Sequence, residues 1–230
     1  GRLGSEEKER RPSQTRLFEC RLLGFQPLKM NFEVFVLPAI EVQGTGALEA
    51  ILQGVFHTII FNRSLYSKCC PREREMDIFE VSYAVSENKE VDKLVFEGIR
   101  SFLRKMDEGK TKTGVACLEF YTVKDEPWGI FKYEKKTIWE KWKVPVSISK
   151  RTITPPQSSE IQASQQEMIR HCLTQIIKKV NTKRSHIPPK EASKDTKRLG
   201  CSPFAIKYDE SSNSIWDGVK QVLKNPPKLM

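Results

Sequence analysis

The sequence predicts an α+β fold in which three main helices pack with a mostly antiparallel sheet. Three segments repeat apolar residues every three or four positions, which is the period of a helix with one buried side. Shorter segments rich in β-branched and aromatic residues lie between them, and glycine and proline mark the breaks. A chain of 230 residues has room for one compact domain with appendages.

The first elements are expected within residues 31–62. Residues 31–37 form an almost wholly apolar stretch that Pro38 ends, so we expect a strand buried on both faces. After a break at residues 44–46, apolar residues at helical spacing predict a strongly buried central helix over residues 47–62. The charged residues 72–75 are then expected to lie in a loop.

The middle of the chain predicts three strands and a helix. Residues 76–85 are rich in β-branched and aromatic side chains and indicate a strand. Ser86 can cap the helix that follows, and Gly109 ends it. Residues 115–123 and 138–148 predict two further strands, which we expect to be antiparallel neighbours joined by a polar connection.

The next segments predict a long helix, a loop and a short strand. Ser158 or Ser159 can open the helix, whose apolar positions continue to about Thr182. Residues 183–202 read as a basic loop, and residues 204–208 alternate as a short strand does.

The two ends of the chain carry different sequence patterns. Residues 1–29 are rich in charged side chains and are expected to be a mobile tail, either native or an artificial extension. The domain is therefore expected to cover residues 30–230. Residues 215–223 carry apolar side chains that fit either a helix or a strand.

Composition narrows the class of protein. With 38% hydrophobic and 30% charged residues, the chain is neither collagen-like nor wholly disordered. The longest apolar run is only a handful of residues, so no transmembrane segment is expected. The net charge is +10, of which residues 1–29 contribute +3 and residues 183–200 contribute +4. The core is therefore nearly balanced, and nucleic-acid recognition is not expected.

The cysteines and histidines show no catalytic or metal-binding pattern. The six cysteines include no Cys-x-x-Cys pair, and the three histidines lack metal-ligand spacing. We therefore expect reduced thiols, a cytoplasmic protein, no metal and no cofactor. Cys172 follows His171, but neighbours on a helix point ~100° apart, so Cys172 and Cys117 are interpreted as buried structural thiols. His57 is interpreted as a packing residue, and a cytosolic thiol hydrolase is the alternative to a protein without catalysis.

Aromatic residues mark two places of interest. Trp139 and Trp142 are three apart, so on a strand they should face opposite sides of the sheet. Both can be core residues, or one can anchor a partner. Trp128 and Phe131 lie within the polar connection, where exposed aromatic surface is unfavourable. They either fold back onto the domain or dock a partner.

Five segments together resemble the HORMA domain. They are residues 55–64, residues 77–85 with the helix that follows, residues 117–121, residues 138–146 and residues 187–189. The Trp-Glu-Lys-Trp strand is shared with spindle-checkpoint members of this family. The His-Thr-Ile-Ile-Phe-Asn-Arg-Ser helix end and the Ile-Pro-Pro after the third helix are most similar to the HORMA subunit of the autophagy-initiation kinase complex.

The resemblance implies an adaptor without catalysis. Such a subunit pairs with the HORMA domain of autophagy-related protein 13, stabilises it and helps the other subunits of the kinase complex to recruit downstream autophagy factors. It resembles the open topological state of the fold. The implied location is the cytoplasm, with recruitment to the pre-autophagosomal structure. The alternative is a checkpoint or repair HORMA adaptor that clasps a peptide motif under its C-terminal segment.

The same resemblance implies site residues. The family's interface uses the end of the first helix and the third helix, which implies partner-binding roles for Asn62, Arg63 and Ser64 and for Gln165 and Arg170. Arg63 would offer a planar fork of donors to carbonyls or carboxylates. Its alternative role is that of a solvated cation at the helix end.

An aromatic finger is also implied. Animal members carry an exposed Trp-x-Phe finger that recruits downstream factors, and Trp128, Ile130 and Phe131 fall in the matching loop. Two residues separate the aromatic side chains here instead of one, so Ile130 and Phe131 are both candidates for the second anchor.

Overall fold

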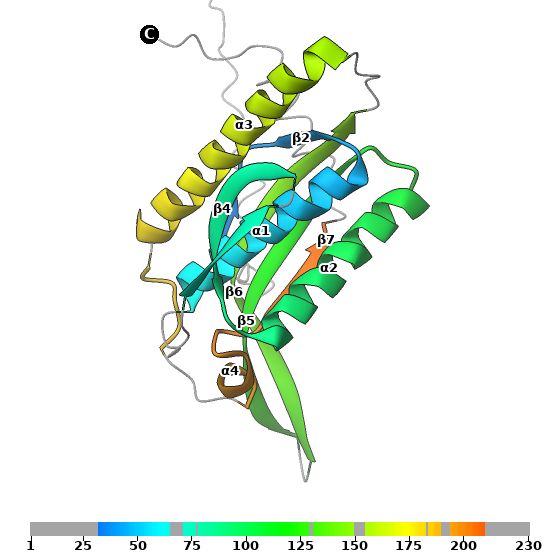
Figure 1. Ribbon diagram of the computed structural model, residues 1–230. Helices are drawn as coiled ribbons and strands as arrows, with labels where there is room; N and C mark the ends of the chain where they lie inside the picture. Colours follow the sequence, from blue (N-terminus) through cyan, green and yellow to red (C-terminus); the bar gives the residue numbers. More distant parts are fainter. Residues whose placement is uncertain are drawn as a thin grey trace, which may run out of the picture. The chain divides into compact units, whose positions relative to one another are not determined.

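The described part of the chain contains three long helices, one short helix, a five-stranded sheet and a separate two-stranded hairpin (Figure 1). The computed structural model describes residues 32–64, 71–76, 78–128, 131–149, 155–182, 184–189 and 194–209. In chain order the elements are β1 (Glu33–Val36), β2 (Ile40–Gln43), α1 (Thr45–Arg63), β3 (Pro71–Met76), β4 (Phe79–Ser86), α2 (Lys89–Glu108), β5 (Thr113–Trp128), β6 (Phe131–Ser149), α3 (Pro155–Thr182), α4 (Lys194–Leu199) and β7 (Phe204–Tyr208).

The larger sheet is mixed but mainly antiparallel. Its strand order is β1-β6-β5-β7, and β2 pairs with another part of β6. The β5–β6 and β5–β7 pairs are antiparallel, as expected for the two central strands, whereas β1 and β2 run parallel to β6. β3 and β4 form the second, antiparallel sheet. The predicted α+β class is therefore confirmed, and the arrangement is compatible with a HORMA domain.

Helix α1 lies at the centre of the core. It contacts α2, α3 and β4, and Figure 1 shows α1 and α2 lying across the same face of the larger sheet. Apolar side chains occur around most of its circumference, and Leu48, Val55, Phe56 and Ile59 are completely buried. A helix that is packed on several sides needs this pattern rather than a single apolar stripe, as the sequence indicated.

Two expectations for the first strands were wrong. In β1 only Phe35 is buried, while Val34 and Val36 are 41% and 43% exposed. β1 turns Phe35 inward, where its ring stacks on Trp142, while Val34 and Val36 lie on its exposed face. The charged residues 72–75 lie within strand β3 rather than in a loop. β3 has β4 on one side only, and charged residues are well tolerated on such an edge strand.

The polar connection expected between the two central strands is itself part of a long hairpin. β5 and β6 remain paired as far as Trp128 and Phe131, which are register partners (Figure 1). Figure 1 shows this end of the hairpin extending beyond the helices. Without a helix layer to bury its side chains, a two-stranded arm can be polar on both faces, so its sequence lacks the apolar alternation of a strand.

Several element boundaries differ from the expected ones. Asn88, not Ser86, caps α2 by accepting from the backbone N–H groups of Glu90 and Val91, because Ser86 is still the last residue of β4. α3 begins at Pro155, a residue suited to the first turn of a helix. The segment expected as a basic loop contains the short helix α4. The element expected over residues 215–223 lies outside the described residues.

Candidate partner-binding surface

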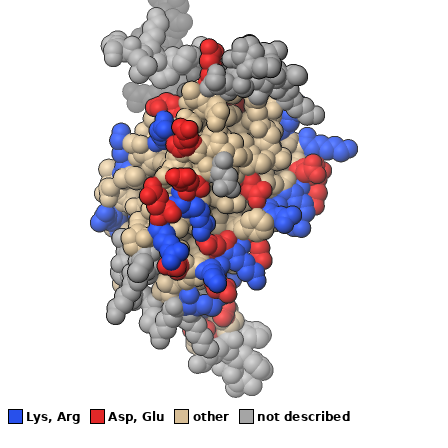
Figure 2. Space-filling model, viewed as in Figure 1, with Lys and Arg blue, Asp and Glu red and all other residues tan. Residues whose placement is uncertain are grey.

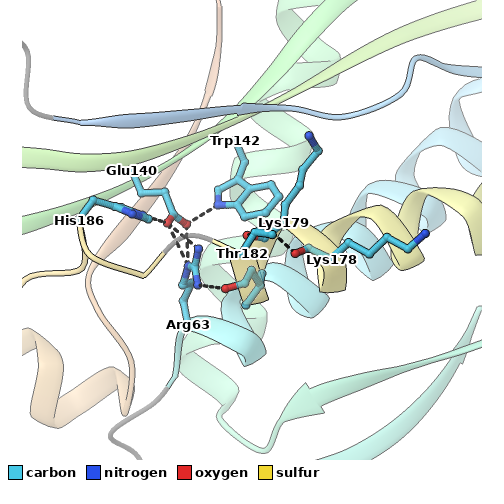
Figure 3. A network of polar contacts seen from close by, with 8 residues as sticks. Arg63, Glu140, Trp142, Lys178, Lys179, Thr182 and His186 are labelled. Atoms are coloured by element: carbon cyan, nitrogen blue, oxygen red, sulfur yellow. Dashed lines mark hydrogen bonds and ion pairs between the residues drawn. The ribbon is translucent and has the colours of Figure 1, made fainter.

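Arg63, the last residue of α1, points into the protein. Its Nε donates to Glu140 Oε1 at 2.9 Å, and Nη2 lies 2.8 Å from Glu140 Oε2 (Figure 3). Arg63 is 2% exposed and Glu140 is completely buried. The guanidinium therefore presents its planar fork to a carboxylate, as expected from its chemistry, but that carboxylate belongs to β6 of the same chain. A solvated helix-end cation is excluded.

Glu140 is the centre of a buried polar network. The indole N–H of Trp142 donates to Oε1, and His186 Nε2 lies within hydrogen-bond distance of Oε2 (Figure 3). Arg63 Nη1 also donates to the carbonyl of Val180 at 3.4 Å. The network therefore joins the ends of α1 and α3 to β6 and to the loop after α3. A buried carboxylate is stable only with such partners.

A β-bulge places Trp139 beside this network. Phe120 pairs with Glu140 and Tyr121 pairs with Ile138, so Trp139 has no register partner of its own. Its ring stacks on Phe120 at 5.3 Å, on the same face of the sheet as Trp142 and its register partner Leu118. The expectation that the two tryptophans face opposite sides was wrong, because the bulge breaks the simple alternation. Both are core residues, at 5% and 0% exposure.

The other two candidate residues at the end of α1 bond locally. Asn62 is half-buried and donates to the carbonyl of Thr58 at 2.8 Å. Ser64 is buried and donates to the carbonyl of Ile60 at 2.7 Å. Of the three predicted partner-binding residues here, Asn62 is therefore the one nearest the surface. Their roles in binding remain predictions.

Helix α3 lies alongside α1 and β4, with one side exposed. Gln165 is half-buried, and Arg170 is exposed and donates to the carbonyl of Glu80 at 3.3 Å. Gln162 similarly donates to the carbonyl of Ile78 at 3.4 Å. Side chains of α3 thus bond to backbone carbonyls in β4 and immediately before it, so α3 is held against this strand. Whether Gln165 and Arg170 bind a partner remains a prediction.

The predicted aromatic finger is only partly described. Ile130 lies outside the described residues, and of Trp128 and Phe131 only the backbone is described. Their positions opposite each other at the end of the β5–β6 register bring the two residues together at the hairpin tip, despite the two residues between them in sequence.

Cys117, Cys172 and His57 occupy structural positions. Burial raises the pKa of the Cys172 thiol to about 12, and burial likewise raises the pKa of Cys117 to about 12, reinforced by Glu119. Cys172 is buried whereas His171 is exposed, so these neighbours do not form a nucleophile and base. Burial lowers the pKa of His57 from 6.5 to about 4, although Asp92, 3.5 Å away, opposes the shift.

The described residues do not favour binding of metal ions, membranes or nucleic acids. They contain no group of three potential ligands that could hold a metal ion. None of the helices among them combines the length and apolarity needed to cross a bilayer. Acidic and basic side chains are interspersed over the face in Figure 2, which is unlike the continuous basic surface that nucleic-acid binding favours.

Fold and site together define an α+β domain whose helix ends are fixed by a buried polar network. The sequence pattern of the family described as autophagy-related protein 101 matches residues 40–194. Autophagy-related protein 101 of Arabidopsis thaliana is 30% identical over 213 residues, which cover 84% of this chain and 96% of the relative. The chain belongs to the autophagy-related protein 101 family. It is therefore an autophagy-related protein, as the HORMA resemblance implied.

The sequence did not reveal the partners of Glu140. The sequence did contain a signal, because Glu140 lies between Trp139 and Trp142 in an apolar strand. If that strand is buried, its carboxylate needs a cation or hydrogen-bond donors as partners. Arg63 offered the cation, but the loop carrying His186 could be placed only by the fold.

Proposed function

We propose that this chain is a non-catalytic adaptor of autophagy initiation that pairs with the HORMA domain of autophagy-related protein 13. It stabilises that domain and connects it with the other subunits of the initiating kinase complex. Membership of the family supports the cellular process, and the resemblance supports the partner. The proposal includes a cytoplasmic location with recruitment to the pre-autophagosomal structure.

The observation that carries the proposal is the buried Arg63–Glu140 network. It fixes the ends of α1 and α3 against β6, so the surface that these two helices present is rigid before any partner arrives. Preorganised surfaces lose less conformational entropy on binding. In this arrangement Asn62 and Arg170 contact the partner, while Arg63 and Ser64 act indirectly by holding the helix end.

The experiment measures binding of the purified partner HORMA domain to the full chain by titration calorimetry. Arg170→Glu is expected to weaken binding at least about tenfold, which corresponds to about 1.4 kcal/mol. Glu97→Lys, on the exposed side of α2, is the matched control and should leave the dissociation constant unchanged. A partner that binds the Arg170 variant as tightly as the unmodified chain would move the interface elsewhere.

A second part of the proposal concerns the hairpin tip. Trp128 and Phe131 end a hairpin that extends beyond the helices, which is a suitable place for an aromatic anchor. Trp128→Ala should abolish recruitment of downstream autophagy factors while the heterodimer forms with unchanged affinity. Loss of the heterodimer, or normal recruitment by this variant, would contradict this assignment.

A further inference from the structure

The outward side of α2 carries a row of cations around one aromatic side chain. Side chains three or four positions apart share one side of a helix. Five exposed residues of α2 follow this spacing, namely Lys89, Lys93, Phe96, Arg100 and Arg104. The opposite side of the helix supplies core residues such as Val95, Ile99 and Phe102. The basic row is therefore an exposed helix face, about 22 Å long from its first residue to its last.

Phe96 and Arg100 form the centre of the basic row. Phe96 is 43% exposed, and the guanidinium of Arg100, one turn further on, lies over its ring at 5.4 Å from the ring centroid. This cation–π contact holds a charge beside an apolar surface. Aromatic and arginine side chains are both enriched at the centres of protein interfaces. The pair therefore offers a partner one apolar contact and one anionic contact at the same place.

The cations of the basic row are weakly neutralised by the chain itself. Lys89, Lys93 and Arg100 form no ion pair with any residue that the structure describes. Arg104 lies 3.7 Å from Glu108, but these side chains are 69% and 65% exposed, and such a pair contributes little. Lys89 is also the first residue of the helix, where the positive end of the helix dipole adds to its charge. The basic row therefore attracts an anionic partner.

Acidic residues limit the width of this positive surface. Glu90, Glu97 and Glu108 are exposed along one flank of the basic row, and Asp107 ends the row at its C-terminal end. A flat anionic surface, such as a membrane or a duplex nucleic acid, would meet these carboxylates together with the cations. A single narrow segment can lie on the cations alone. The charge pattern therefore favours a slender acidic occupant.

We propose that the basic row of α2 is a docking site for an acidic amphipathic helix of another protein. This helix lies along α2 with its carboxylates opposite the cations and one apolar side chain against Phe96, which removes apolar surface from water. Residues four positions apart are about 6 Å apart along any α-helix, so carboxylates at that spacing match Lys89 with Lys93 and Arg100 with Arg104. Recognition of a helix by such regularly spaced anchors is a common binding mode.

The docking site is separate from the surface proposed for the heterodimer. That surface lies on α3 and the end of α1, and Figure 1 shows α1 lying between α3 and α2. An acidic helix on α2 can therefore bind whether or not the heterodimer has formed. The inference rests on the charges and exposure of α2 and does not depend on the proposed function.

The test is fluorescence anisotropy of a labelled synthetic peptide titrated with the full chain. The peptide is a helix of about 16 residues with glutamate at every fourth position, one central leucine and alanine elsewhere. We expect binding in about 50 mM salt and at least about tenfold weaker binding in about 500 mM salt, because added ions screen exposed charges. Arg100→Glu should weaken binding at least about tenfold, and Phe96→Ala at least about threefold. A peptide with glutamine in place of glutamate should not bind.

Three controls separate the docking site from net charge and from the heterodimer. Arg170→Glu on α3 makes the same charge change as Arg100→Glu and should leave the affinity for the peptide unchanged. Glu97→Lys should strengthen peptide binding, because it removes a carboxylate that flanks the basic row. Arg100→Glu should leave heterodimer formation unchanged, so failure of this inference is distinguishable from failure of the proposed function. Circular dichroism of each variant establishes that the fold is intact.

An acidic peptide that does not bind in low salt would overturn the proposal. So would equal weakening by Arg100→Glu and Arg170→Glu, which would show that only the net charge of the chain matters. Vesicles of phosphatidylcholine and phosphatidylserine in equal parts test the other anionic partner. Vesicle binding that requires Arg100, in a chain that does not bind the peptide, would assign the basic row to a membrane surface and would likewise overturn the proposal.

Discussion

The side chain of Asn88 joins the start of α2 to Leu199 at the end of α4. Its Oδ1 accepts from the backbone N–H of Glu90 at 2.9 Å, and its Nδ2 donates to the carbonyl of Leu199 at 3.0 Å. One amide thus satisfies a free donor at one helix start and a free acceptor at another helix end. The segment that leads into β7 is attached to α2 by this contact and by the ion pair of Arg198 with Glu90.

Asn88→Asp should separate these two roles. Aspartate keeps the acceptor that caps α2 but loses the N–H groups that hold the α4 carbonyls. We expect the stability of α2 to be retained while amide exchange accelerates in residues 196–201. Asn88→Ala loses both roles and should also destabilise α2 by about 1 kcal/mol. Hydrogen exchange with mass spectrometry distinguishes the variants, and equal exchange of α4 in Asn88→Asp and the unmodified chain would refute the attachment.

The free energy of unfolding should fall far more when one member of the Arg63–Glu140 pair is removed than when both charges are removed. Arg63→Ala leaves a buried carboxylate without its cation, which should lower the free energy of unfolding by about 3–5 kcal/mol. Arg63→Met combined with Glu140→Gln removes both charges at similar volume and should cost clearly less. Urea unfolding of the three proteins measures the difference. A double variant as unstable as Arg63→Ala would show that the charges are not coupled.

The sequence predicted an element correctly where a single apolar periodicity determines its secondary structure. α1 could be predicted because its apolar residues repeat at the helical period with few gaps, and the pairing of β5 with β6 followed from two apolar strands in succession. The same reasoning failed for β3, whose alternating arginines and glutamates resemble a solvated loop. Edge strands do not need an apolar face, so only the pairing with β4 reveals this strand.

The site was less predictable than the fold. The face of Trp139 depends on a bulge, which changes side-chain direction without a distinctive sequence pattern. The burial of Arg63 depends on Glu140, 77 positions away in the chain. Residue chemistry correctly indicated a fork that binds a carboxylate, but it could not say whether that carboxylate lies in this chain or in a partner.

Acid should destabilise the domain through His57. Because burial lowers the pKa of His57 to about 4 from the unfolded value of 6.5, the unfolded chain binds more protons as the pH falls through this range. The contribution of His57 to stability is therefore complete above pH 6.5 and is lost progressively towards pH 4, by about 3 kcal/mol in all. Asp92 and Arg74 face this histidine and are already included in the direction of the shift.

His57→Gln removes the titrating group while retaining polar atoms. Its free energy of unfolding should change less than that of the unmodified chain between pH 6.5 and pH 4. His171→Gln, at an exposed position on α3, is the control and should keep the pH dependence of the unmodified chain. Urea midpoints across this pH range provide the measurement. Parallel pH profiles for the unmodified chain and His57→Gln would exclude His57 as the cause.

Gly98 determines how closely β7 packs on α2. A Cβ atom at this position would lie 2.6 Å from the Cβ of Ile206, closer than two carbon atoms can approach. Gly98→Ala should therefore displace β7 and cost about 1–3 kcal/mol through overpacking, which outweighs the roughly 1 kcal/mol gained in helix propensity. We expect faster amide exchange in residues 204–208 as the direct sign of this displacement.

Shortening Ile206 to alanine should not relieve this overlap, because alanine keeps the Cβ atom. The double variant Gly98→Ala with Ile206→Ala should therefore leave the amides of β7 no better protected than Gly98→Ala alone. Gly46→Ala is the control, because a Cβ there would meet no atom within 4 Å, so β7 should be unaffected. If Gly98→Ala leaves the exchange of β7 unchanged, the close approach of α2 to Ile206 does not hold β7 in place.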